Sequence, residues 1–360
     1  MAARVKQVLQ RYGRTAFLFH SSVFVATLTG SYAAINQGVN LEASLSVSFS
    51  SPPPPPPPPP PALSLSLDMR RFFSRFASRA PVRAGHQMPQ RTVPSSIPHP
   101  PYAASGAMSD LKSFIPILDA EQQHRLRAAC ALAKEIRDFA KPLCVVGVPT
   151  EEVDRIVHEE IIRRGAYPSP LNYGGFTKSL CSSVNEIVVH GIPDSRPLED
   201  GDIVNIDISV FLDGFHGDTS QTYIVGENVD EAGRHLVDVT NQALEGAIEN
   251  CCKPLNRFAT IGDYVQTLAD KEGLGVVREY TGHGIGKEFH CLPFILHNRN
   301  GEPGKMLPGM AFTVEPALTE GSPKIIHWDD GWTVATADGG RSAQAEHTVL
   351  ITEDGADILT

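Results

Sequence analysis

The chain has 360 residues, of which 41% are apolar and 20% charged, a composition typical of one large globular domain or two ordinary ones. The formal net charge of −10 is unevenly divided, because residues 1–108 hold ten basic and two acidic residues while residues 109–360 carry a net charge of −18. An acidic body argues against nucleic acid as a partner, since phosphate binding needs clustered Lys and Arg, and it suits divalent cations better.

Residues 1–108 predict a disordered, basic, Pro-rich targeting extension. They lack a sustained helical or strand period and contain ten consecutive prolines, Pro52–Pro61, between Ser-rich stretches. The apolar stretch at 16–28 is short and interrupted by His20, so no membrane span is expected and a secretory signal is not favoured.

The stretch 69–108 has the composition of an organelle transit peptide. It is rich in Arg and Ser, and no acid follows until Asp110. We therefore expect a mitochondrial location, with plastid or cytoplasm as alternatives. A basic arm that carries no address is the other interpretation of this stretch. Translation from Met1 or from Met69 stays open, because the second methionine opens the transit-like stretch.

Residues 109–360 predict one α+β catalytic domain that folds without the extension. A capping box, Asp119 with Gln122, begins a helix whose apolar residues recur every three or four positions to Phe139, before Pro142 ends it. Further helices are expected at 150–165, 230–250 and 260–272, and β-type runs at 187–190, 203–211, 215–225, 311–316 and 347–351. The elements mix without a regular βαβ rhythm, which favours α+β.

Two segments of the domain resemble one another. Residues 198–207 read LEDGDIVNID and residues 307–315 read LPGMAFTVE. In each, a glycine precedes a strand and a carboxylate follows six residues later, Asp207 after Gly201 and Glu315 after Gly309. Two halves built alike would each present an acid to one centre, although chance similarity between two strands is the alternative.

The dipeptide Asp213-Gly214 predicts a two-residue β-hairpin. If Leu212 pairs with Phe215, then Asp207 opposes Ser220, and Asp218 lies on the same face as Asp207. Diagonal neighbours of this kind are about 7–8 Å apart, so both carboxylates can reach one pair of metal ions. Two solvated acids on a strand face are the alternative.

Three further residues complete a candidate ligand set. Glu315 and Glu346 lie at apolar strands, where an acid is costly unless it is paired or bound to metal. His283 lies between glycines in TGHGIG, which let the backbone approach a ligand closely. Four carboxylates and one imidazole suit two divalent ions of Mn, Fe, Co or Zn rather than a single tetrahedral zinc.

Six spaced motifs together resemble the type 1 methionine aminopeptidases over about residues 115–360: NYGGFTKSLCSSVNEIVVHGIP, DGDIVNIDI, DGFHGDTS, TGHGIGKEFH, FTVEP and SAQAEHTV. The resemblance implies the pseudo-twofold pita-bread fold and a dinuclear metal site. Its ligands would be Asp207, Asp218, His283, Glu315 and Glu346. His190 and His290 would contact the substrate near the scissile bond, and the methionine pocket would consist of Tyr173, Phe176, Cys181, Phe289 and Trp332.

The chain departs from the family in two places. The Cys/His-rich zinc-binding region of the cytosolic eukaryotic enzymes is absent before the catalytic domain, so the chain resembles the bacterial or organellar branch. Pro170 stands near the position where some members have a further cysteine, which leaves that side of the methionine pocket open.

The resemblance implies removal of the initiator methionine from nascent proteins and peptides whose second residue is small. Glu315 is the candidate proton acceptor, and His190 and His290 would bond the carbonyl oxygen or the leaving amide. An organellar ribosome is a candidate partner. The alternatives are an Xaa-Pro aminopeptidase or prolidase and a non-catalytic pita-bread binding module. GHGIGK fits neither GxxxxGK[ST] nor GxGxxG, so a nucleotide loop is disfavoured.

Overall fold

The computed structural model describes residues 79–108 and 113–360. Four α-helices occupy the predicted positions, and short 3-10 helices follow the first helix and precede β2. They are α4 (Ala120–Ala140), η1 (Lys141–Leu143), α5 (Thr150–Arg163), η2 (Tyr173–Gly175), α6 (Glu231–Cys251) and α7 (Ala259–Glu272). The proline run, the possible start at Met69 and the rest of 1–78 lie outside the described residues.

Helix α4 begins at the predicted capping box, in which the Asp119 side chain accepts from the Gln122 backbone N–H and the Gln122 side chain accepts from Asp119 N–H. Its apolar face is buried as predicted up to Ile136, but Phe139 is 39% exposed and the prediction was wrong there. The reason is the 3.6-residue period, which places Ala140, four residues after Ile136, on the buried face instead.

An antiparallel sheet of nine strands, rather than a sheet of mixed direction, forms the centre, in the order β1-β4-β5-β14-β9-β7-β8, with β2 added beside β4 and β15 beside β14. Two three-stranded sheets, β13-β10-β6 and β11-β12-β3, complete the α+β fold. The strands are β1 (Tyr167–Pro168), β2 (Cys181–Val184), β3 (Ile187–Val189), β4 (Ile203–Leu212), β5 (Phe215–Ile224), β6 (Gly275–Val276), β7 (Gly282–Gly284), β8 (Cys291–Ile295), β9 (Ala311–Val314), β10 (Ala317–Thr319), β11 (Ile325–His327), β12 (Val334–Thr336), β13 (Ser342–Gln344), β14 (Glu346–Ile351) and β15 (Ala356–Ile358).

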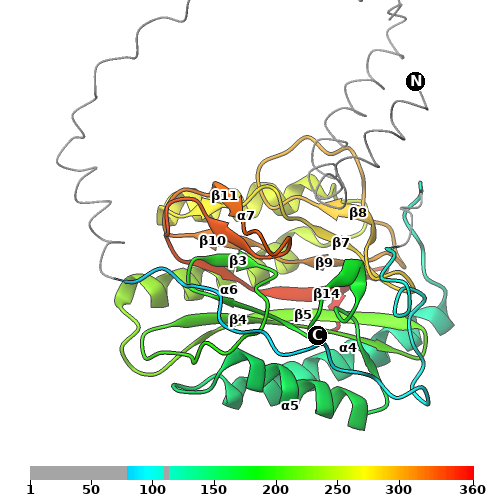
Figure 1. Ribbon diagram of the computed structural model, residues 1–360. Helices are drawn as coiled ribbons and strands as arrows, with labels where there is room; N and C mark the ends of the chain where they lie inside the picture. The colour runs from blue at the N-terminus through cyan, green and yellow to red at the C-terminus, as the bar shows by residue number, and fades with distance from the viewer. Residues whose placement is uncertain (1–78, 109–112) are drawn as a thin grey trace, which may run out of the picture. The chain divides into compact units, whose positions relative to one another are not determined.

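The helices pack on the central sheet through two main apolar clusters. In Figure 1, β4, β5, β14 and β9 cross the middle of the view, with α4 and α5 below them and α7 above. Helices α4 and α5 pack against Ile206 and Ile208 of β4, and helices α6 and α7 pack against Phe312 and Val314 of β9. These apolar residues alternate with the candidate ligands Asp207 and Glu315, which therefore point to the opposite side.

The β4–β5 hairpin has the predicted register. Leu212 pairs with Phe215 across the Asp213-Gly214 turn, and the pairing continues without a bulge to Ile203 opposite Ile224. Asp207 opposes Ser220, as the turn position predicts.

The two similar segments occupy equivalent places, which confirms the pseudo-twofold prediction. Gly201 N donates to Val225 O at 3.0 Å, just beyond the end of β5, and Gly309 N donates to Ile351 O at 2.8 Å, at the end of β14. Both glycines have positive φ, 103° and 87°, a conformation that other residues rarely adopt. Each glycine therefore starts one strand of an antiparallel pair in the same way.

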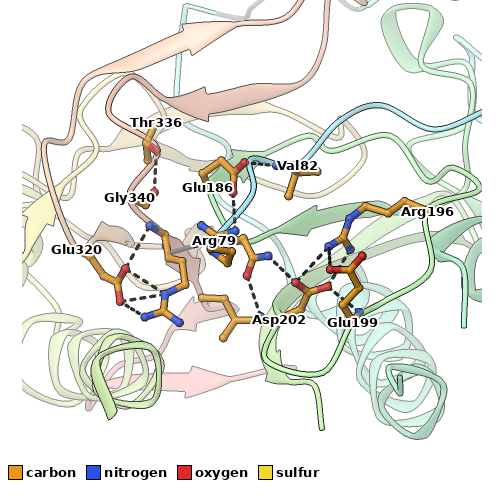
Figure 2. A network of polar contacts seen from close by, with 12 residues as sticks. Arg79, Val82, Glu186, Arg196, Glu199, Asp202, Glu320, Thr336 and Gly340 are labelled. Atoms are coloured by element: carbon orange, nitrogen blue, oxygen red, sulfur yellow. Dashed lines mark hydrogen bonds and ion pairs between the residues drawn. The ribbon is translucent and has the colours of Figure 1, made fainter. Parts of the chain in front are cut away.

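Residues 79–108, which we call the strap, differ from the prediction. They belong to the same compact unit as the catalytic domain, so the described part of that unit begins at residue 79 rather than at residue 109. Figure 2 shows Arg79 and Val82 converging on Glu186, to which Arg79 Nη1 donates at 2.8 Å and Val82 N also donates. An extended coil of this kind has no local period, and its order comes from distant side chains.

Within residues 79–108 and 113–360, no helix has both the length and the apolar character that a membrane crossing requires.

Candidate metal and substrate site

Neighbouring strands of the central sheet bring the candidate ligands into one row. Asp207 of β4 and Glu346 of β14 both pair with Ser220 of β5, one from each side, and Asp218 lies two residues before Ser220 on the same face. Glu315 directly follows Val314, which pairs with His347 and so brings Glu315 beside Glu346.

His283 reaches the row from β7, on the far side of β9, and its backbone N–H donates to Thr313 Oγ1 at 2.9 Å. Ligand atoms of Asp218, His283 and Glu346 lie within 4.8 Å of one another. His283 Nε2 is 3.5 Å from Asp218 Oδ2 and 3.6 Å from Glu315 Oε1. Asp207 completes the row, and its Oδ1 is buried without a hydrogen-bond partner among the described residues. The five predicted ligands therefore lie on, or directly after, five strands that are neighbours in the sheet, β4, β5, β14, β9 and β7.

The hydrogen bonding of His283 leaves Nε2 available. Nδ1 lies 3.2 Å from Gly284 O, and a carbonyl only accepts, so Nδ1 carries the proton. Nε2 faces the carboxylates, and a cation bound among them would take its lone pair, the arrangement that metal-binding histidines use.

Four carboxyl groups at such close quarters, two buried and two partly buried, are unfavourable without a cation. Burial, together with the charges of Asp218 and Glu315, raises the pKa of Asp207 well above its usual value. Burial and the neighbouring acids do the same to the pKa of Glu346, and burial is the main cause that raises the pKa of Glu315 to about 7. A divalent cation would stabilise the ionised forms and fill the unsatisfied position at Asp207 Oδ1, so these residues fit a metal centre.

Several supporting side chains escaped the sequence analysis. Thr313 Oγ1 donates to Glu315 Oε1 at 2.7 Å, Gln344 Nε2 donates to Glu315 Oε2 at 3.1 Å, and Ser209 Oγ donates to Asp218 Oδ1 at 2.7 Å. Glu315 N donates to His297 Nε2 at 2.9 Å. The strand period could have found Thr313 and Gln344, since each stands two residues before a candidate ligand. His297 carried no local signal.

His190, Trp332 and Phe176 form one group of pocket residues. His190 follows β3 with a positive φ of 57°, and its ring centroid lies 5.9 Å from that of Trp332. Phe176 meets Trp332 edge-on at 5.1 Å. Tyr280, which the sequence analysis missed, packs against His190 at 5.2 Å. Burial among these rings lowers the pKa of His190 to about 4, so the imidazole is neutral at pH 7.

Tyr173, Phe289 and His290 form a second group. Tyr173 stacks on His290 and meets Phe289 edge-on, each with ring centroids 5.0 Å apart. The ring centroid of His290 lies 4.1 Å from that of His283. The Nδ1 atom of His290 is buried without a hydrogen-bond partner among the described residues. Burial lowers the pKa of His290 well below its usual value, so this ring is neutral too. An unpaired ring nitrogen beside the carboxylates is available to a substrate.

Cys181, the remaining predicted pocket residue, and two further histidines, His216 and His347, lie near the ligand row. Cys181 of β2 opposes Asp207 and is buried, which places it beside the ligand row. His216 Nδ1 pairs with Ser169 Oγ at 2.9 Å, and His347 Nδ1 pairs with Thr360 Oγ1 at 3.0 Å. Both histidines thus bond hydroxyl groups through Nδ1.

Comparison with known proteins gives one consistent result. The Metallopeptidase family M24 profile matches residues 124–353. Methionine aminopeptidase 1D, chloroplastic/mitochondrial, of Arabidopsis thaliana is 51% identical over 282 residues, covering 78% of this chain and 80% of the relative. The mitochondrial Methionine aminopeptidase 1D of Homo sapiens is 48% identical over 268 residues, covering 74% and 79%.

Solved structures agree with these relatives. Methionine aminopeptidase from Rickettsia prowazekii superposes with a TM-score of 0.67 at 44% identity, covering 69% of this chain and 100% of that one. Prolidase from Pyrococcus furiosus gives a TM-score of 0.53 at 22% identity, covering 68% of this chain and 65% of that one, which shows a shared fold alone. The predicted pita-bread fold is confirmed.

Proposed function

Because this chain belongs to the methionine aminopeptidases of metallopeptidase family M24, we propose that it hydrolyses the bond after the initiator methionine of proteins whose second residue is small. The observation that carries the proposal is the row of carboxylates with His283, flanked by two aromatic groups that each contain a neutral histidine. The substrates are peptides and nascent proteins with N-terminal methionine, and those emerging from an organellar ribosome are included.

Two divalent ions of Co, Mn, Fe or Zn would be held by Asp207, Asp218, His283, Glu315 and Glu346. When bound, such ions lower the pKa of a water molecule to near 7 and stabilise developing negative charge on the peptide carbonyl. Four carboxylates and one imidazole are more ligands than one tetrahedral ion takes, which supports two ions.

The chain's own residues orient the substrate and move protons. Tyr173, Phe176, Cys181, Phe289 and Trp332 would bind the methionine side chain, because sulfur packs favourably against aromatic rings by about 0.3–1.5 kcal/mol. Glu315, whose Oε1 accepts from Thr313, would take the proton of the attacking water at its carboxylate. His190 and His290, both neutral, would hydrogen-bond the carbonyl oxygen and the leaving amide nitrogen.

Neither alternative function has the same support. A prolidase-like activity rests on structures that are 18–22% identical, whereas the methionine aminopeptidase of Arabidopsis thaliana is 51% identical and that of Rickettsia prowazekii 44%. A non-catalytic binding module has no need of metal ligands, and all five are present and adjacent here.

The deciding experiment uses the purified chain, stripped of metal and reloaded with one metal at a time. Met-Ala-Ser should be cleaved and an Ala-Pro peptide should not. Met-Ala should be cleaved much faster than Met-Lys, because the second side chain must be small. Equal rates on the two Met peptides would contradict this specificity, and cleavage of Ala-Pro alone would favour the prolidase alternative.

The proposed location is the mitochondrion, with the plastid as the second choice in a photosynthetic host. It is supported by the basic, Ser-bearing composition of the extension and by relatives named as mitochondrial or chloroplastic. A fluorescent protein fused after residues 1–78 should enter the organelle. Diffuse cytosolic fluorescence from that fusion and from one carrying residues 1–108 would refute the location.

A further inference from the structure

Tyr102 of the strap is fixed beside the substrate pocket. Its side chain is 4% exposed, and its hydroxyl donates to Ser169 O at 2.6 Å. The next residue, Ala103, accepts from Asn172 Nδ2 at 2.8 Å. These two bonds attach the strap to the segment directly before η2, which begins at Tyr173.

Two series of ring contacts connect Tyr102 with the second group of pocket residues. In the first, Tyr102 meets Tyr173 edge-on at 4.9 Å, and Tyr173 stacks on His290 at 5.0 Å. In the second, Tyr102 lies parallel to His216 at 6.0 Å, and His216 stacks on Phe289 at 5.0 Å with an angle of 9°.

These rings border open space rather than solid core. A cavity of about 370 Å³ is lined by Tyr102, Tyr173, His216, Phe289 and His290, together with residues of the loops around them. Side chains on the edge of a void have no packing partners on that side. The positions of these side chains therefore depend on the ring contacts that remain. Tyr102 supplies one contact to Tyr173 and one to His216.

The strap also reaches the first group of pocket residues from its other end. Arg79 and Val82 bond Glu186 in the turn between β2 and β3, and His190 directly follows β3 (Figure 2). One extended segment thus contacts the supports of both histidine-containing groups.

We propose that Tyr102 is a positioning residue of the methionine pocket, which fixes Tyr173 and His216 and through them His290 and Phe289. The inference rests on the proposed function, since it concerns how that pocket keeps its shape. The aromatic ring of Tyr102 makes both contacts, with Tyr173 and with His216, so the ring fixes their positions. The hydroxyl of Tyr102 attaches the ring to Ser169.

The test compares Tyr102→Ala and Tyr102→Phe with the wild-type chain and with Tyr264→Ala, a tyrosine of α7 in the other half of the domain. The readout is kcat/KM on Met-Ala-Ser and on Leu-Ala-Ser, and the ratio between them. This ratio does not change when a variant only lowers the amount of folded enzyme. Metal content per chain is measured for every variant.

Misplacing a positioned group by about 1 Å can cost about 10²-fold in rate, so Tyr102→Ala should lose about 10- to 100-fold in kcat/KM on Met-Ala-Ser with its metal retained. The preference for Met over Leu should also fall. Tyr102→Phe should keep both values within about threefold, and Tyr264→Ala should keep the ratio. If Tyr102→Ala does not fold, Tyr102→Leu replaces it.

An unchanged ratio in Tyr102→Ala, or an equal loss in Tyr102→Phe, overturns the inference. If the wild-type chain cleaves neither peptide, the proposed function fails, and the inference is then decided by NMR of histidine-labelled protein. The ring signal of His290 should shift in Tyr102→Ala because the stacked Tyr173 ring moves, and an unshifted signal overturns the inference.

Discussion

The two halves of the catalytic domain share a strand plan and pack their helices on the sheet through apolar clusters, but the first half is also covered by the strap. In the second half, α6 and α7 pack on β9 and β14 through an apolar cluster that includes Leu236, Val265 and Phe312. In the first half, charged groups with little exposure also bond the strap. Glu151 and Asp154 accept from Arg91, and Lys178 donates to Met88 O.

The difference shows that the strap completes the first half. Beyond Glu151 and Asp154, it donates to two more carboxylates of low exposure, Glu186 from Arg79 and Asp194 from Gly85. Buried charges are tolerated only when they are paired or hydrogen-bonded. The charged groups of low exposure in the first half therefore need the strap as their bonding partner.

The largest expected effect follows from removing the strap. A chain beginning at residue 79 should fold and cleave Met-Ala-Ser, but a chain beginning at residue 109 should not be recovered folded. The second chain loses two buried side chains, Ile97 and Tyr102, at about 1.5–3 kcal/mol each. It also loses charge-assisted hydrogen bonds at about 1.5–3 kcal/mol each, and the total approaches the whole stability of about 5–15 kcal/mol.

Circular dichroism and size-exclusion chromatography of both chains provide the measurement. A folded, fully active chain beginning at residue 109 would mean that the domain boundary lies where the composition alone predicts it, and that the strap is dispensable.

The second prediction concerns the boundary between the halves, where each contributes proposed metal ligands. Asp218→Asn removes a ligand supplied by the first half and Glu346→Gln one supplied by the second. Both variants should fold, bind less metal than the wild-type chain and lose peptidase activity to background. Metal content per chain and kcat, determined on identically prepared proteins, check this. If only one variant lost metal, the two halves would not share one metal centre.

The third prediction separates metal binding from substrate contact. His190 lies outside the ligand row, beside Trp332, so His190→Ala should keep its metal and lose about 10²- to 10⁴-fold in kcat, the usual contribution of a general acid or base. Metal content and kcat are compared with those of Asp218→Asn. Loss of metal would make His190 a ligand, and an unchanged kcat would leave it without a role in the reaction.

Local signals in the sequence predicted most of the ligand row and none of the strap. The Asp213-Gly214 turn determined the register that places Asp207 and Asp218 on one face, because a two-residue turn fixes every pair that follows it. The strap has no such period. Its partners Glu186 and Asp194 lie more than 100 residues away in sequence, so only the folded domain reveals them.

The fourth prediction uses pH to test the charged groups of the first half that bond the strap. Burial raises the pKa of Asp154 to about 6 from 3.8, so the folded chain binds more protons than the unfolded chain between these values. Its contribution to stability therefore falls as pH rises through this window, by at most about 3 kcal/mol. Asp154→Asn, compared with the wild-type chain by urea denaturation without metal, should remove that part of the pH dependence. A larger loss of stability with rising pH in the variant would contradict the assignment.

The smallest expected effect compares the equivalent glycines of the two halves. An alanine at either position adopts positive φ, at about 1–2 kcal/mol. At Gly201 the added Cβ meets only Asn228 O at 3.4 Å, an ordinary contact, but at Gly309 it would lie 2.9 Å from Ile117 Cγ2 and 3.0 Å from Leu118 O. Gly309→Ala should therefore cost about 1–3 kcal/mol more than Gly201→Ala, the usual penalty of overpacking. Urea denaturation of both variants gives the difference. Equal losses would mean that the segment around Leu118 moves aside freely, and that the two halves differ at this turn less than their contacts indicate.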